Sequence, residues 1–240
     1  MDKDAIEKIE SLVRDSFIVE IEGRQYSAKN LEPVIFEPRA EALETHSLTA
    51  IVDFLTKNQD AITATGVIIH VVDYKTVSVL SELSPELRRR DTYIATGLDE
   101  TAEYPFGKFM PVEEFIIRLN SQFAGSDDNE RLCKFVSKVT IENGITKEDD
   151  GITQVATVKK SVSGAITEIK SAPKSVKLRP FRTFLEIEQP ESEMLFRMKE
   201  QGQEIACALF EADGGRWKYE AIDRIKKYLQ EYLPDFVVIA

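Results

Sequence analysis

The sequence predicts an α+β protein, with mainly antiparallel β-sheets, helices packed on one face and two similar-sized halves. Short segments that alternate between apolar and polar residues recur along the 240 residues, and such alternation is typical of half-buried strands. Longer segments between them repeat apolar residues every three or four positions, as one face of a helix does. The composition is 42% hydrophobic and 30% charged, which is typical of a globular chain that buries a core.

The first segment predicts a short amphipathic helix. Residues 4–13 place Ile6, Ile9 and Val13 on one helical face, and this face is suited to docking or to an oligomer contact. A hairpin is expected next, because Gly23 accepts the positive φ of a tight turn between two alternating segments. The strands are expected at residues 17–21, 25–28 and 33–37.

The next segment predicts a capped helix and a three-stranded meander. Ser47 has the side chain of a helix N-cap, and an apolar stripe runs from Leu48 to Leu55 and ends near Asn58. Segments rich in β-branched residues then alternate with short polar links, as in an antiparallel meander. These strands are expected at residues 66–73, 76–82 and 91–97.

Two further helices are expected before the middle of the chain. Pro111 suits the first position of a helix, and Glu113 and Glu114 favour its positive end. Its apolar face is expected to consist of Val112, Phe115, Ile116, Leu119 and Phe123. A second helix is expected at residues 129–140.

A domain boundary is expected in the polar run 143–151, which gives an N-terminal half at 1–145 and a C-terminal half at 146–240. The second half predicts an antiparallel sheet followed by a helix at residues 216–233 and a last strand at 236–239. Its other strands are expected at residues 152–158, 162–169, 175–178, 182–187, 193–198 and 204–210.

Charge is distributed unevenly along the chain. The net charge is −11, which disfavours general attachment to nucleic acid or to anionic membranes. Residues 159–182 are the exception, with seven basic side chains and one acid. This segment is either a solvated hairpin face or a surface for phosphate or an acidic partner. Together with the arginine triplet, the candidate binding surface is Lys159, Lys160, Lys170, Lys174, Lys177, Arg179, Arg182, Arg88, Arg89 and Arg90.

No residue pattern identifies an activity, a cofactor or a metal site. The two cysteines, Cys133 and Cys207, lie in apolar contexts and are expected to be buried free thiols. The two histidines, His46 and His70, are not expected to be catalytic, and the phosphate-binding glycine motifs are missing. Acidic pairs near residues 186–188 and 211–213 leave a metal-dependent enzyme as one alternative.

The second half also carries motifs that point to a family. Residues 178–184 read LRPFRTF, residues 188–192 read EQPES and residues 207–217 read CALFEADGGRW, and residues 104–110 read YPFGKFM. With these motifs, the chain from about His46 onward resembles uncharacterised proteins of tailed phages and prophages, and in particular the YfdQ-like family. The resemblance implies a gene expressed in the bacterial host, sometimes near recombination or replication genes, and names no catalytic group.

We therefore expect a cytoplasmic, non-enzymatic binding protein encoded by a phage or prophage. The N-terminus lacks a signal-peptide profile, and no apolar stretch approaches the length of a membrane span. The expected partners are nucleic acid or a host protein, and the chain is expected to form a homo-oligomer without cofactors. The first role is an accessory factor in phage DNA replication or recombination. The alternatives are an acidic inhibitor or sponge that counters a host defence system, and a metal-dependent enzyme.

Overall fold

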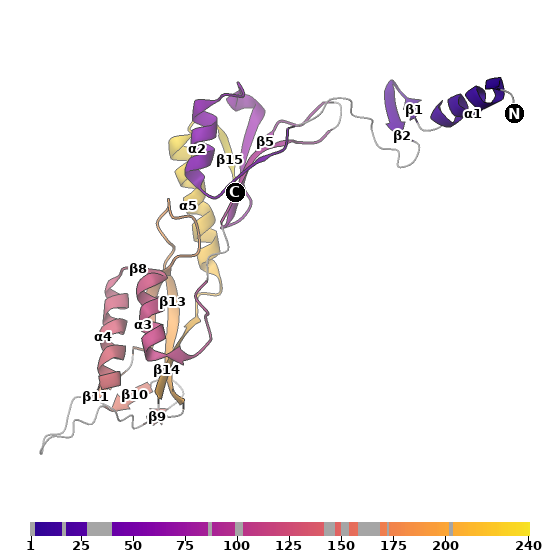
Figure 1. The fold of residues 1–240 in the computed structure, drawn as a ribbon. Coiled ribbons are helices and arrows are strands. Elements are labelled where there is room, and N and C mark those ends of the chain that lie inside the picture. Colours follow the sequence, from indigo (N-terminus) through magenta and orange to yellow (C-terminus); the bar gives the residue numbers. More distant parts are fainter. Residues whose placement is uncertain are drawn as a thin grey trace, which may run out of the picture.

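The α+β class is confirmed by the computed structural model of the chain (Figure 1). The structure describes residues 3–15, 18–27, 40–85, 88–98, 103–141, 147–149, 154–157, 169–171, 173–201 and 204–240. Within these residues, most strand pairs are antiparallel, and two five-stranded sheets dominate. We name these sheets after their central strands, β5 and β13.

The β5 sheet has the strand order β15-β4-β5-β6-β3. It contains the predicted meander, which is confirmed as antiparallel, and it adds a parallel strand at each edge. Helices α2 (Leu48–Lys57) and α5 (Arg216–Tyr232) pack against one face of it. Its strands are β3 (Leu43–Thr45), β4 (Val67–Val71), β5 (Thr76–Ser81), β6 (Thr92–Gly97) and β15 (Val237–Ile239), and a short 3-10 helix, Ala64–Gly66, precedes β4.

Helix α2 forms where its local signals predict it. The Ser47 hydroxyl accepts a hydrogen bond from the backbone N–H of Ala50 at 3.2 Å, which satisfies a free donor of the first turn. Asn58 ends the helix in the left-handed conformation, with φ 42°, and its backbone N–H donates to the Phe54 carbonyl. The stripe between these caps faces the sheet, with Leu48, Ile51 and Leu55 buried.

The β13 sheet has the order β7-β14-β13-β12-β8. Helices α3 (Val112–Ser121) and α4 (Asp127–Ile141) cover one face and share a hydrophobic cluster with it. Both helices were predicted, but Pro111 lies at the N-cap position of α3, and Phe123 lies in β8 beyond the helix. The strands are β7 (Met110–Pro111), β8 (Phe123–Ala124), β12 (Ser175–Pro180), β13 (Ser192–Gln201) and β14 (Glu204–Glu211).

The predicted strand at residues 182–187 is wrong, because residues 181–191 form a loop between β12 and β13. The buried side chain of Gln189 holds this loop in shape. Its Oε1 accepts from the backbone N–H of Arg182 at 3.1 Å, and its Nε2 donates to the Phe184 carbonyl at 3.0 Å. Phe184 and Ile187 pack into the core under the β5 sheet, so this loop joins the two sheet units.

The smaller elements lie outside the two main sheets. Helix α1 (Lys3–Asp15) and the hairpin of β1 (Ile18–Ile21) and β2 (Arg24–Ser27) are confirmed, with positive φ at Glu22 and Gly23 in the turn. A three-stranded sheet contains β9 (Lys147–Asp149), β10 (Gln154–Thr157) and β11 (Ile169–Ser171). The predicted strand at 33–37 and residues 162–168 of the predicted strand at 162–169 fall outside the described residues.

The two hydrophobic clusters do not follow the predicted boundary at residues 145/146. The cluster under the β5 sheet combines residues 48–94 with Phe184, Ile187 and residues from α5. The cluster under the β13 sheet combines residues 104–136 with residues 176–209. Packing of the described residues therefore gives no support to a division there. None of the helices in the described ranges is long and apolar enough to span a membrane.

Candidate nucleic-acid interface

The predicted basic residues that the structure describes do not form one surface. Arg88, Arg89 and Arg90 lie in the connection between β5 and β6, whereas Lys177 and Arg179 lie on β12 in the other sheet. Lys170 belongs to β11, and no side-chain position is described for it. Lys159 and Lys160 lie outside the described residues.

Arg182 is buried, contrary to the expectation of an exposed cation. Only 8% of it is exposed, and its guanidinium stacks on the Trp217 ring, 3.6 Å from the centroid. It donates to the Glu211 carboxylate at 2.5 Å and also to the Ser192 hydroxyl. Burial lowers the pKa of Arg182, and the nearby carboxylates of Glu211 and Asp213 oppose this shift. The residue therefore holds the fold together and presents no charge to a partner.

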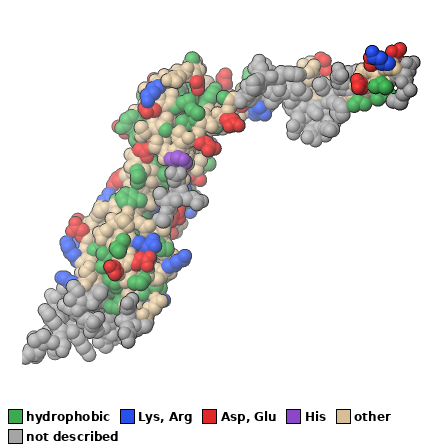
Figure 2. All heavy atoms as spheres, in the orientation of Figure 1, with side chains coloured by type: hydrophobic (Ala, Val, Ile, Leu, Met, Phe, Trp, Pro, Cys, Tyr) green, Lys and Arg blue, Asp and Glu red, His purple; other side chains and the backbone are tan. Residues whose placement is uncertain are grey.

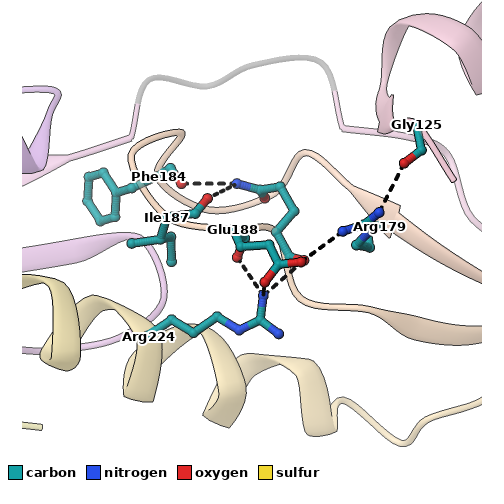
Figure 3. A network of polar contacts seen from close by, with 7 residues as sticks. Gly125, Arg179, Phe184, Ile187, Glu188 and Arg224 are labelled. Atoms are coloured by element: carbon teal, nitrogen blue, oxygen red, sulfur yellow. Dashed lines mark hydrogen bonds and ion pairs between the residues drawn. The ribbon is translucent and has the colours of Figure 1, made fainter.

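Arg179 is similarly engaged (Figure 3). Its guanidinium donates to the Glu188 carboxylate at 2.8 Å and to the Gly125 carbonyl at 3.0 Å. Arg224 of α5 approaches Glu188 from the other side, with an ion pair at 3.3 Å and a hydrogen bond to the Glu188 carbonyl at 2.8 Å. Glu188 thus lies between two arginines that come from different sheet units.

Among the described residues of the predicted segment, the two lysines Lys174 and Lys177 are exposed. Lys177 lies between Val176 and Leu178, which are both buried in the core, so its side chain lies on the outer face of the β13 sheet. Its ammonium is 3.8 Å from the Glu191 carboxylate, and 68% of the side chain is exposed. An exposed pair at this distance is weak and easily exchanged for another anion.

Two cations that the sequence analysis did not select lie on the same outer face. In β13, Met194, Phe196 and Met198 are in the core, so Arg197 and Lys199 lie on the opposite face. The alternation of this strand was the signal that would have found them. The predicted surface was built from cations that are close in sequence, whereas Arg197 and Lys199 follow one another at alternate positions of β13, and Lys177 on β12 lies opposite the exposed Glu193 of that strand.

Two phenylalanines complete the outer face. The Phe109 and Phe210 rings are 6.1 Å apart between centroids at an angle of 67°, and the Lys199 ammonium lies 4.2 Å from the Phe109 centroid. Both rings are partly exposed. Proteins that bind single-stranded nucleic acid combine aromatic rings, on which bases stack, with cations that contact phosphates.

A glycine turn positions Phe109. Gly107 has φ 74°, and its backbone N–H donates to the Leu209 carbonyl at 2.8 Å, which ties the turn to β14. A Cβ at Gly107 would contact the Phe210 ring at 3.7 Å, so space is available, and the restriction comes from the positive φ. The segment before β7 is therefore fixed where it brings Phe109 beside Phe210.

Several described polar groups that could take part in catalysis make contacts within the fold. The Ser192 hydroxyl is buried and donates to the Asp213 carboxylate at 2.5 Å. The His46 imidazole Nδ1 lies 2.9 Å from the Gly97 carbonyl oxygen. Cys207 is buried, and this burial raises the pKa of its thiol to about 12, while Cys133 is half-buried. Within the described residues, no three His, Cys, Asp or Glu side chains are grouped closely enough to hold a metal ion.

Comparison of the chain with protein-family models, with curated proteins and with solved structures finds no match. The resemblance to the YfdQ-like family therefore stays a prediction. The candidate site is the outer face of the β13 sheet, which we define by Phe109, Phe210, Lys177, Arg197 and Lys199.

Proposed function

We propose that the chain is a non-enzymatic protein that binds single-stranded DNA through the outer face of the β13 sheet. The observation that carries the proposal is the contact of the Lys199 ammonium with the Phe109 ring, 4.2 Å from its centroid, beside Phe210. Stacking of a base on an aromatic side chain contributes about 1–3 kcal/mol and tolerates any base. Lysine and arginine on the neighbouring strands supply the contacts to phosphate.

The packing behind this face also favours binding of single-stranded DNA. Helices α3 and α4 and a closed hydrophobic cluster fix the strands from behind, so the rings and cations are held in place before a ligand arrives. Sheets that expose aromatic residues in front of two helices are a common platform for single-stranded nucleic acid. The overall charge of −11 does not oppose this, because binding depends on the local field and on local contacts.

The biological setting is part of the proposal. The resemblance to phage proteins favours an accessory role in phage DNA replication or recombination, in the cytoplasm of the bacterial host. A protein in this role contacts single-stranded intermediates, for which stacking surfaces give affinity without sequence preference.

The test measures binding of a labelled 40-base oligonucleotide by fluorescence anisotropy over a range of salt concentrations. The variant Lys177→Ser/Lys199→Ser should bind more weakly, and the slope of log K against log salt should fall by about 1.4, or 0.7 for each phosphate that is no longer neutralised. The matched control is Lys57→Ser/Lys227→Ser, which removes two exposed charges from α2 and α5 and should leave both the affinity and the slope unchanged.

A wild-type chain that binds no oligonucleotide at 50 mM salt would overturn the proposal. An equal effect of the control pair would show that charge alone, and not this face, determines binding. If duplex of the same sequence binds as tightly as the single strand, stacking on Phe109 and Phe210 is not the source of affinity. Absence of DNA binding would redirect the search to a basic host protein, as the acidic-inhibitor alternative expects.

A further inference from the structure

Helix α1 carries an exposed apolar stripe. At 100° per residue, Ala5, Ile6, Ile9, Leu12 and Val13 fall within an arc of about 120° centred on Ile9. The exposed fractions are 40% for Ile6, 53% for Ile9, 60% for Leu12 and 48% for Val13. Figure 2 shows hydrophobic side chains exposed along this helix. Such a stripe is suited to contact with another surface.

Ile6, Ile9 and Leu12 of this stripe stay exposed in the described part of the chain. Every side chain described in residues 3–13 is exposed, as are those of residues 19–25 in the hairpin. An isolated helix of 13 residues is marginally stable in water, and so is a lone two-stranded hairpin. A contact on the stripe would therefore contribute directly to the stability of α1.

Charged residues at the two edges of the stripe indicate which kind of surface would fit against it. Lys8 lies about 100° to one side of Ile9, and Glu10 lies about 100° to the other side. When two copies of α1 pair in parallel about a two-fold axis, the Lys8 edge of each helix faces the Glu10 edge of the other. The two positions differ by about 3 Å along the axis, which is within reach of these long side chains. An antiparallel pair would place Lys8 near Lys8 and Glu10 near Glu10.

We propose that α1 pairs in parallel with α1 of a second copy of this chain, through the stripe of Ile6, Ile9, Leu12 and Val13. The contact is the same patch on both copies, as two-fold dimers require. An anionic membrane fits α1 less well, because the helix has four acidic and three basic residues. The inference goes beyond the proposed DNA binding and does not depend on it.

The test is the mass of the full chain in solution, measured by light scattering on a sizing column at several concentrations. The wild type should have twice the monomer mass of 27.2 kDa and should dissociate on dilution. Ile9→Asp should give a monomer. Lys8→Glu and Glu10→Lys should each raise the dissociation constant about tenfold, because each turns two attractive pairs into two repulsive ones.

Charge exchange makes the test specific for a parallel pair. The double variant Lys8→Glu/Glu10→Lys should regain the wild-type mass, and a mixture of the two single variants should form mixed dimers. Ser11→Glu, on the opposite side of α1, is the matched control and should dimerise normally. A wild-type monomer at every concentration would overturn the inference, as would a dimer that Ile9→Asp leaves intact. Single variants that do not recover on mixing would also overturn the parallel arrangement.

The outcome is separable from that of the DNA experiment. Lys177→Ser/Lys199→Ser should dimerise like the wild type, and Ile9→Asp should still bind a short oligonucleotide through the outer face of the β13 sheet. Loss of dimerisation in Lys177→Ser/Lys199→Ser would contradict the placement of the two functions on different surfaces.

Discussion

The β5 sheet and the β13 sheet are built alike but differ in the face that they turn away from their helices. Each has five strands and two helices on one side. The strands of the β5 sheet contain no lysine or arginine, whereas β12 and β13 contribute Lys177, Arg179, Arg197 and Lys199. The same layered construction therefore leaves the β5 sheet without lysine or arginine, with Glu44 exposed at its edge, whereas the β13 sheet has four of these basic residues and two partly exposed rings alongside Glu193.

The difference shows that the fold alone does not indicate a site. Inner positions of both sheets are filled by the same kinds of residue, because a core accepts any well-packed apolar side chain. Outer positions are free of that requirement, so cations and rings that recur there point to a contact outside the chain. Core packing does not fully explain Phe109 and Phe210, since both remain partly exposed.

The largest expected effect tests whether the two faces of the β13 sheet are as different as the packing indicates. Leu178→Ala removes a fully buried side chain from the core and should lower the free energy of unfolding by about 2–5 kcal/mol. Lys177→Ala, one residue earlier on the outer face, should change it by less than about 0.5 kcal/mol. Urea denaturation of both variants measures this, and equal losses would show that the outer face is buried against something else.

The next effect concerns the residues that join the two sheet units. Arg182→Ala removes the stack on Trp217 and leaves Glu211 and Ser192 without their partner. We expect a loss of about 2–3 kcal/mol, less than for a fully buried pair because 39% of the Glu211 side chain is exposed. The measurement is thermal unfolding followed by two probes, one for each sheet unit.

Arg216→Ala is the control for this change. Its side chain is 81% exposed and pairs with Glu220 at 3.5 Å, so its removal should cost less than about 0.5 kcal/mol. If Arg182→Ala lowers the free energy of unfolding as little as Arg216→Ala does, the contact with Trp217 does not join the two sheet units.

A smaller effect sharpens the contrast between the outer faces. Phe109→Leu keeps the apolar volume near Phe210 but removes the ring below the Lys199 ammonium. The affinity for a single-stranded oligonucleotide should fall about tenfold, within the range for loss of one stacked base. Tyr232→Leu removes an aromatic ring that is 55% exposed on α5 of the other unit, and its affinity should stay that of the wild type. Equal losses of affinity in both variants would show that exposed rings of the two sheet units contribute alike to binding.

Local signals in the sequence predicted most of the helices and strands. Ser47 and Asn58 fix α2 through hydrogen bonds within a few residues, so neighbouring residues contain the information. The loop at 181–191 could not be predicted in this way. Phe184 and Ile187 look like alternate strand residues, but they are apolar because they pack into the core of the other sheet unit. Only the folded chain shows that contact.

The candidate site likewise contains residues that the local sequence predicted and residues whose role depends on contacts in the folded chain. Lys177 was selected from its neighbours in sequence, and Arg182 was selected for the same reason but is buried. Arg197 and Lys199 were visible in the alternation of β13, but their relation to Phe109 depends on the pairing of β14 with β7 through residues far apart in the chain. The two residues of β7 are too short a segment to recognise as a strand.

Alkaline pH distinguishes the cores of the two sheet units. Burial raises the pKa of Cys207 in the β13 core to about 12, whereas the β5 core contains no cysteine. In the unfolded chain this thiol loses its proton near pH 8.5. The stability that the buried neutral thiol provides is therefore complete below pH 8.5 and declines as the pH rises towards 12, by about 1 kcal/mol per pH unit.

Urea unfolding at pH 8, 9 and 10 measures the slope. Cys207→Ala should flatten it, while Cys133→Ala should leave most of it, because only the fully buried thiol is held so far from its usual pKa. An unchanged slope in Cys207→Ala would show that groups other than this thiol cause the loss of stability at alkaline pH.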